Sequence, residues 1–151
     1  MRALRLTILG LELALVILAV LSAYTLVMAL TATVSEEENT FSMDRVIDPE
    51  TGDWRFILKG RPRNEGFLDV TFGVKARLLT LTNKTLAEDE NSTRVAPGGV
   101  GEFTVSLLLT KEMIDRYGVE QNQGAMELEI RIRTLMDLTG YVVKMRIRGE
   151  G

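Results

Sequence analysis

The chain of 151 residues is 46% hydrophobic and 26% charged, and its formal net charge is −3. It has no cysteine and no histidine, which excludes disulfides, thiol nucleophiles, zinc sites built on Cys or His, and Ser-His-Asp catalysis. The weak and mixed charge argues against nucleic-acid binding, and we expect neither a cofactor nor a metal ion.

The stretch Leu13–Val34 carries no charge, no proline and no glycine. As an α-helix it would be about 33 Å long, which matches the ~30 Å hydrocarbon core of a bilayer. Arg2 and Arg5 precede it and acidic residues follow it, which predicts a cytoplasmic N-terminus and an extracytoplasmic C-terminal domain. Residues 1–34 are therefore predicted to be an uncleaved signal anchor that spans the lipid bilayer once. A cleaved signal peptide is the alternative, but its apolar region would be shorter.

Glu12 lies one turn inside the apolar stretch. An intramembrane acid is a functional candidate by default, but at this depth it can reach the cytoplasmic headgroups as a tolerated boundary charge. Gly10 followed by Glu12 also resembles the processing site of type IV pilins and archaellins, in which a peptidase cuts after a glycine and an acid follows inside the helix. This resemblance implies a filament subunit that self-associates through its N-terminal helix. The acid falls at the second mature position instead of the fifth, and no basic pair adjoins Gly10.

Residues 35–40 are predicted to be an acidic linker, and residues 41–151 one extracytoplasmic domain. Two strands are expected first, at Phe41–Ile47 and Trp54–Leu58, joined by a turn rich in Asp, Pro and Gly. Residues 68–78 then alternate strictly between apolar and polar side chains, which predicts a strand with one buried and one exposed face and a bulge near its end.

Two polar segments are predicted to be surface loops, residues 60–66 and 83–93. Because loops carry function more often than core strands, they supply the candidate interaction residues: Arg61, Arg63, Asn64, Glu88, Asp89 and Glu90. The second loop also holds two N-x-[ST] sequons, at Asn83 and Asn91, which are candidate N-glycosylation sites. Its acidic cluster can be read as a calcium site, but the spacing of a calcium loop is missing, and a solvated loop is the preferred interpretation.

The second half of the domain is predicted to contain a strand, a short helix and a hairpin, at residues 103–109, 111–117, 126–133 and 141–148. Thr110 is expected to cap the helix and Gly118 to stop it. In the hairpin, a register with Ile130 opposite Met145 also sets Glu129 opposite Arg146, so that apolar and charge matching agree. Six or seven strands with one short helix predict an all-β fold, an antiparallel β-sandwich of fibronectin or immunoglobulin type.

Three segments, Trp54–Leu79, Val95–Leu109 and Gly140–Gly149, resemble the late embryogenesis abundant type 2 (WHy) domain. The pattern is an Asn-containing loop before a long alternating strand, then a proline/glycine turn before another alternating strand. Asn64 occupies the loop, although the family's fuller Asn-Pro-Asn loop is missing. The resemblance implies a fibronectin-like sandwich, often membrane-anchored, with stress-protective or accessory binding roles and no catalysis.

The leading hypothesis is a single-pass membrane protein that presents a non-catalytic β-sandwich outside the cytoplasm, for interaction or for structural and stress-protective support. Its expected partners are the lipid bilayer and a protein. The alternative is a pilin-like filament subunit whose helix packs in the fibre core. Scarce glutamine beside many charged residues is typical of thermophilic proteins.

Overall fold

The computed structural model describes residues 2–34, 41–80, 82–117 and 124–148. The elements in chain order are α1 (Arg2–Val34), β1 (Phe41–Ile47), β2 (Trp54–Gly60), β3 (Val70–Thr80), β4 (Thr85–Val95), β5 (Phe103–Leu109), α2 (Lys111–Tyr117), β6 (Gly124–Thr134) and β7 (Thr139–Arg148). The predicted linker at residues 35–40 and the predicted helix stop at Gly118 lie outside the described residues.

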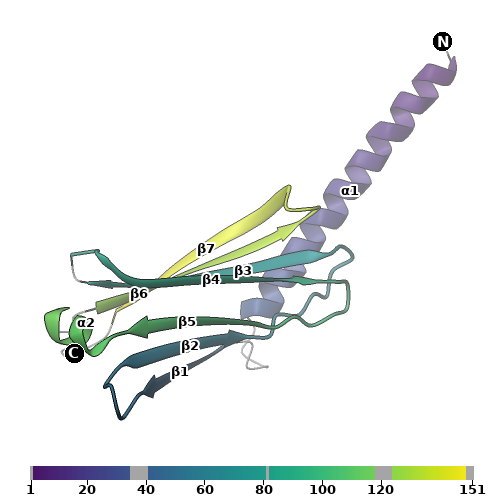
Figure 1. Cartoon of the computed structure of the whole chain (residues 1–151). Helices are drawn as coiled ribbons and strands as arrows, with labels where there is room; N and C mark the ends of the chain where they lie inside the picture. The colour runs from purple at the N-terminus through teal and green to yellow at the C-terminus, as the bar shows by residue number, and fades with distance from the viewer. Residues whose placement is uncertain (1, 35–40, 81, 118–123, 149–151) are drawn as a thin grey trace.

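The described strands form two antiparallel sheets, stacked as two layers (Figure 1). The three-stranded sheet has the order β1-β2-β5, and the four-stranded sheet has the order β4-β3-β6-β7. The predicted antiparallel β-sandwich behind a long N-terminal helix is therefore confirmed.

Alternating strands build the core between the sheets. In β3, Val70, Phe72 and Val74 are buried, and Val105 and Leu107 of β5 are buried in the same core. Each such side chain contributes about 1.5–3 kcal/mol to stability through removal of apolar surface from water. The predicted bulge is present, since the pairing of β3 with β4 shifts at the end of the apolar alternation.

Helix α1 has an exposed half and a packed half. The side chains of residues 10–20 are exposed on all sides of the helix. Further along, Ser22, Thr25, Leu26 and Ala29 are buried. Their spacing puts them on one helix face, which packs against β6, β3 and β7. Figure 1 shows the N-terminal half extending beyond the strands while the C-terminal half lies against them.

The prediction of a second surface loop at residues 83–93 is wrong, because most of this segment is strand β4. The strand pairs along almost its whole length with β3, and two of its three acids lie opposite bases: Glu88 opposite Arg77, and Glu90 opposite Lys75. The apolar alternation expected of a half-buried strand is missing from residues 88–94, so hydrophobic periodicity does not reveal it. The charge complementarity with β3 is the signal that does.

The β6–β7 hairpin exists with the predicted faces but a different register. Ile130 pairs with Val143 instead of Met145, and Glu129 pairs with Lys144 instead of Arg146. Because acids and bases alternate with period two on the two strands, a slip of two residues preserves both the buried face and the charge matching. The turn therefore decides the register. It is shorter than the predicted register requires, because Thr134 already pairs with Thr139.

Helix α2 is short, and its single buried side chain, Ile114, reaches the core. Thr110 caps it as predicted, since its hydroxyl accepts a hydrogen bond from the Met113 N–H at 3.4 Å. The carboxylate of Asp53 adds a second contact, accepting from the Lys111 N–H at 2.8 Å. The turn before β2 and the helix after β5 are thereby joined.

Candidate functional site

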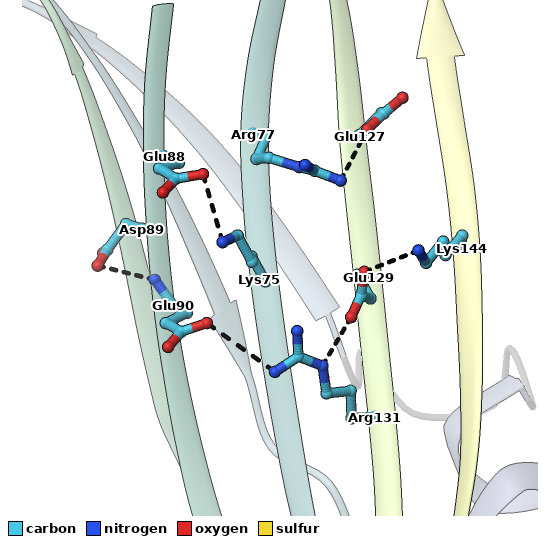
Figure 2. A network of polar contacts seen from close by, with 9 residues as sticks. All are labelled: Lys75, Arg77, Glu88, Asp89, Glu90, Glu127, Glu129, Arg131 and Lys144. Atoms are coloured by element: carbon cyan, nitrogen blue, oxygen red, sulfur yellow. Dashed lines mark hydrogen bonds and ion pairs between the residues drawn. The ribbon is translucent and has the colours of Figure 1, made fainter. Parts of the chain in front are cut away.

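A ladder of ion pairs crosses the outer face of the four-stranded sheet (Figure 2). Arg77 contacts Glu127 at 3.1 Å, and Lys75 contacts Glu88 at 3.3 Å. The remaining pairs join β4, β6 and β7: Arg131–Glu90, Arg131–Glu129, Lys144–Glu129 and Arg146–Glu127. Five bases and four acids therefore neutralise one another, and the surface presents little net charge to a partner.

Glu129 is the best shielded acid of this ladder, with its side chain 13% exposed. Arg131 Nε donates to its carboxylate at 2.6 Å, and Lys144 Nζ lies 3.3 Å from it. The hydrogen bond from Arg131, followed by that from Lys144, holds the pKa of Glu129 below its ordinary value of 4.5. This acid is a structural charge of the sheet at neutral pH.

A groove of about 340 Å³ lies above Gly73 on the same face, where β3 lacks a side chain. Lys75, Arg131 and Arg133 line it together with Glu90. Opposite charges are mixed in this groove, and among the described residues no cluster of three or more acidic side chains is suited to a metal ion. The groove is a polar surface feature with no arrangement typical of catalysis.

The predicted contact residue Asn64 is fully buried, which corrects its assignment to an exposed loop surface. Its Nδ2 donates to the carbonyls of Leu68 at 2.8 Å and Val95 at 3.0 Å, and its Oδ1 accepts from the Gly66 N–H at 2.9 Å. Its backbone also pairs with the turn at residues 98–99. Asn64 therefore joins the β2–β3 loop to the turn before β5.

The other residues predicted for the first loop are exposed and form ion pairs with nearby acids. Arg61 Nε lies 3.2 Å from Glu102, and Arg63 Nη1 lies 3.8 Å from Glu65. Such exposed pairs contribute little to stability. Their position leaves them accessible, and the acids that they contact, Glu102 and Glu65, do not belong to the predicted set Glu88, Asp89 and Glu90.

Asp89 and Asn91 link the two sheets at the β4–β5 edge. The Asp89 carboxylate accepts from the Ser106 N–H at 2.8 Å, and Asn91 Nδ2 donates to the Thr104 carbonyl at 2.9 Å. These side chains satisfy backbone groups along the edge of β5, which otherwise has no strand beside it on that side. This explains why β4 is polar on the face it turns towards the other sheet.

The two predicted sequons differ in their surroundings. Asn91 uses the same amide nitrogen that glycosylation would modify for its bond to β5. Asn83 lies in the turn between β3 and β4, has a positive φ of 61°, and accepts a hydrogen bond from Arg146 through its Oδ1. Of the two, Asn83 is the more accessible acceptor.

An apolar cavity of about 290 Å³ opens between the sheets at the end of α1. It is lined by Leu30 of α1, Phe41 of β1, residues of β2, β3 and β6, and Val143 and Met145 of β7. The sandwich is open here because β7 has no partner in the three-stranded sheet, and α1 fills part of the gap.

Close contacts fix α1 to the sandwich. The Thr25 hydroxyl accepts a hydrogen bond from the Phe67 N–H at 3.1 Å, and the rings of Tyr24 and Phe67 stack with centroids 5.3 Å apart. Ser22 and Thr139 join their hydroxyls at 2.9 Å. The sequence signal for this packed face is a pair of polar residues at helical spacing inside an apolar run, Ser22 and Thr25. Composition alone does not reveal it.

The helix also meets the length and composition of a membrane span. Residues Gly10–Ala32 have a mean hydropathy of 2.6 and form the one such candidate among the described residues. Glu12, the predicted intramembrane acid, is exposed on the free half of this helix. The packed face at Ser22–Ala29 and the candidate span therefore overlap.

Comparison with known proteins shows the fold and nothing finer. No family model matches the chain, and no curated protein matches it. Solved structures with similar architecture include a putative beta-galactosidase from Bacteroides fragilis (TM-score 0.51, 9% identity) and a calcium-binding mutant of Bacteroides uniformis beta-glucuronidase 2 (TM-score 0.51, 10% identity). A protein from Archaeoglobus fulgidus matches over 73% of this chain and 95% of its own, with 10% identity and a TM-score of 0.44.

The similar regions cover 78% and 77% of this chain but only 17% of the galactosidase and 14% of the glucuronidase. Each likeness therefore concerns one β domain of a much longer enzyme. The fold and the helix define a β-sandwich that carries a candidate membrane-spanning helix at its N-terminus.

Proposed function

We propose that this chain is a single-pass membrane protein in which α1 anchors a non-catalytic β-sandwich outside the cytoplasm. The observation that carries the proposal is the division of α1: one half is apolar and exposed on all sides, and the other half is packed into the sandwich. An exposed helix surface that is apolar except for Glu12 is costly in water and favourable in lipid. The arginines near its start favour a cytoplasmic N-terminus.

The role of the sandwich is binding or structural support, as in the late embryogenesis abundant type 2 domain that the sequence resembles. Two of the three segments that carry the resemblance are in contact here, since Asn64 bonds to the turn at residues 98–99. The neutralised ion-pair ladder and the absence of histidine and cysteine favour a domain without catalytic chemistry. The more specific proposal, a stress-protective function, rests on this resemblance alone.

Membrane flotation of the full chain tests the anchor. The parent protein is expected to float with vesicles and to resist carbonate extraction, whereas Leu15→Lys with Ile17→Lys moves it to the soluble fraction. Leu108→Lys with Val46→Lys, which places the same two charges at exposed apolar side chains of β5 and β1, is the matched control and is expected to float. A parent protein that stays soluble without lipid contradicts the proposal.

The same preparation separates the filament alternative. Fibres that sediment without lipid, built from a chain whose intact mass lacks the first ten residues, would favour a pilin-like subunit. An intact chain that remains monodisperse in detergent favours the anchored sandwich.

A further inference from the structure

Three apolar side chains are the most exposed large hydrophobic residues in the described part of the sandwich. Met136 is 88% exposed, Leu138 is 83% exposed and Phe67 is 63% exposed. We call these three residues the apolar rim. Such side chains on a soluble surface mark a contact with another apolar phase when they are gathered at one place.

The rim lies at the end of the sandwich from which α1 emerges. Phe67 stacks on Tyr24 of α1, and Thr139, next to Leu138, bonds to Ser22 of α1. Figure 1 shows the β6–β7 turn reaching further towards the N-terminus of α1 than the other strands do. Phe67 and the β6–β7 turn therefore lie beside α1 near residues 22–24, where its exposed half meets its packed half.

The turn that carries two of the rim residues has an uncommon backbone. Leu135, Met136 and Asp137 all have positive φ values of 52°, 53° and 67°, and the turn closes with a hydrogen bond from the Leu138 N–H to the Leu135 carbonyl at 3.1 Å. Consecutive non-glycine residues rarely adopt this left-handed region. Backbone strain of this kind is concentrated at functional sites, and here it turns two large apolar side chains outward.

The length of the free helix fits a bilayer that ends at the rim. Residues 6–21, between Arg5 and the packed face, form about 24 Å of α-helix. A span a few ångström shorter than the ~30 Å hydrocarbon core is accommodated by local thinning of the bilayer and by snorkelling of the flanking arginine. A bilayer that instead covered residues 13–34 would submerge the strands packed on Ser22–Ala29. With the bilayer ending at the rim, Tyr24 lies at the headgroup level, where tyrosine is enriched.

We infer that the apolar rim inserts into the outer surface of the bilayer, so that the sandwich lies directly on the membrane that α1 spans. This inference rests on the proposed anchoring and deepens it, because it assigns a lipid-binding surface to the sandwich itself. Asp137 and Arg133, which lie along the same groove beside the turn, stay in the polar headgroup layer.

Because the chain has no cysteine, single cysteines can report depth without background. Met136→Cys, Met113→Cys and Leu15→Cys are each labelled with an environment-sensitive fluorophore in the full chain, reconstituted in phosphatidylcholine vesicles. Quenchers are attached to the lipid headgroup or deep on the acyl chain. Met113, an exposed methionine of α2 at the opposite end of the sandwich, is the matched control.

The expected result is a blue shift and strong headgroup-level quenching at position 136, deep quenching at position 15, and neither effect at position 113. Quenching at position 15 with position 136 indistinguishable from position 113 overturns the apolar rim while the anchor stands. No quenching at position 15 overturns the anchor itself. Protection of position 136 that persists in detergent and grows with protein concentration shows that a second copy covers the rim, and also overturns the inference.

Discussion

Asn64 connects two loops through a side chain that has no contact with water. Its amide group makes three hydrogen bonds, two as donor to carbonyls and one as acceptor. Asn64→Asp would place an acceptor oxygen against the carbonyls of Leu68 and Val95, and a buried polar group without its partners costs about 1–3 kcal/mol. We expect a loss of about 3 kcal/mol in the free energy of unfolding, measured by urea denaturation in detergent.

Asn83→Asp is the control for this change, because Asn83 is exposed and its Oδ1, which a carboxylate retains, is the atom that contacts Arg146. A surface substitution of this kind changes stability by about 0.5 kcal/mol or less. Equal losses for the two variants would show that Asn64 is not the link between the loops.

Glu129 gives the sheet a pH-dependent contribution. Its pKa is held below the ordinary value of 4.5, chiefly by the hydrogen bond from Arg131. A group whose pKa is lowered by folding stabilises the fold above its unfolded pKa, and this contribution is lost as the pH falls through its folded pKa. We expect the melting temperature of the parent to fall more between pH 7 and pH 3 than that of Glu129→Gln.

Glu112→Gln, which removes an exposed acid of α2, is expected to follow the parent over the same pH range. If Glu129→Gln also shows the parent's full pH response, the ion-pair ladder does not depend on Glu129.

At the scale of elements, the contact between α1 and the β2–β3 loop requires a glycine. A Cβ on Gly66 would lie 2.4 Å from Thr25 Cγ2 and 2.8 Å from the helix backbone. Gly66→Ala must therefore push the helix away from the sandwich, and overpacking of this kind costs about 1–3 kcal/mol. Gly73→Ala is the control, because a Cβ there meets its neighbours at an ordinary 3.7 Å.

Protease digestion of the two variants in detergent measures the result. Gly66→Ala is expected to be cut faster near the base of α1, while Gly73→Ala keeps the parent's pattern. An unchanged pattern in both would mean that the helix does not depend on this close approach.

The elements differ in how far their sequences predict them. Strands β3 and β5 are readable because each buries one alternating face, and β1 because turn residues bound it. Strand β4 is not readable from periodicity, since Asp89 and Asn91 face the other sheet to bond its edge rather than to fill the core. The β6–β7 register escapes prediction because its charge pattern repeats every two residues.

At the scale of the whole molecule, the inferred contact between the rim and the bilayer implies a different depth for Glu12. The sequence suggests a charge near the cytoplasmic headgroups, whereas a bilayer ending at the apolar rim places Glu12 ten residues, about 15 Å, from Ser22 and near the bilayer centre. A central acid costs about 3 kcal/mol on insertion scales. Glu12→Leu is therefore expected to increase the carbonate-resistant fraction of the protein.

Leu11→Ala, a neighbouring neutral change, is the control for Glu12→Leu. An unchanged fraction for Glu12→Leu would place the acid at the headgroups, as the sequence predicts, and a decrease would mean that Glu12 makes a favourable contact in the membrane.

The site was less predictable than the fold for one physical reason. A polar loop predicts exposed side chains, yet Asn64 is buried and makes the hydrogen bonds that its loop requires. The apolar rim, in turn, is visible only once the β6–β7 turn and α1 are placed at the same end of the molecule. Neither long-range relation is encoded in local periodicity.

The sides of the membrane on which the N-terminus of α1 and the sandwich lie test the central claim most directly. In cells that express the full chain, Ala3→Cys and Glu50→Cys are each treated with a membrane-impermeant maleimide, before and after permeabilisation. The anchored sandwich predicts labelling of position 50 in intact cells and of position 3 only after permeabilisation. Labelling of both positions in intact cells, or of position 3 alone, would contradict it.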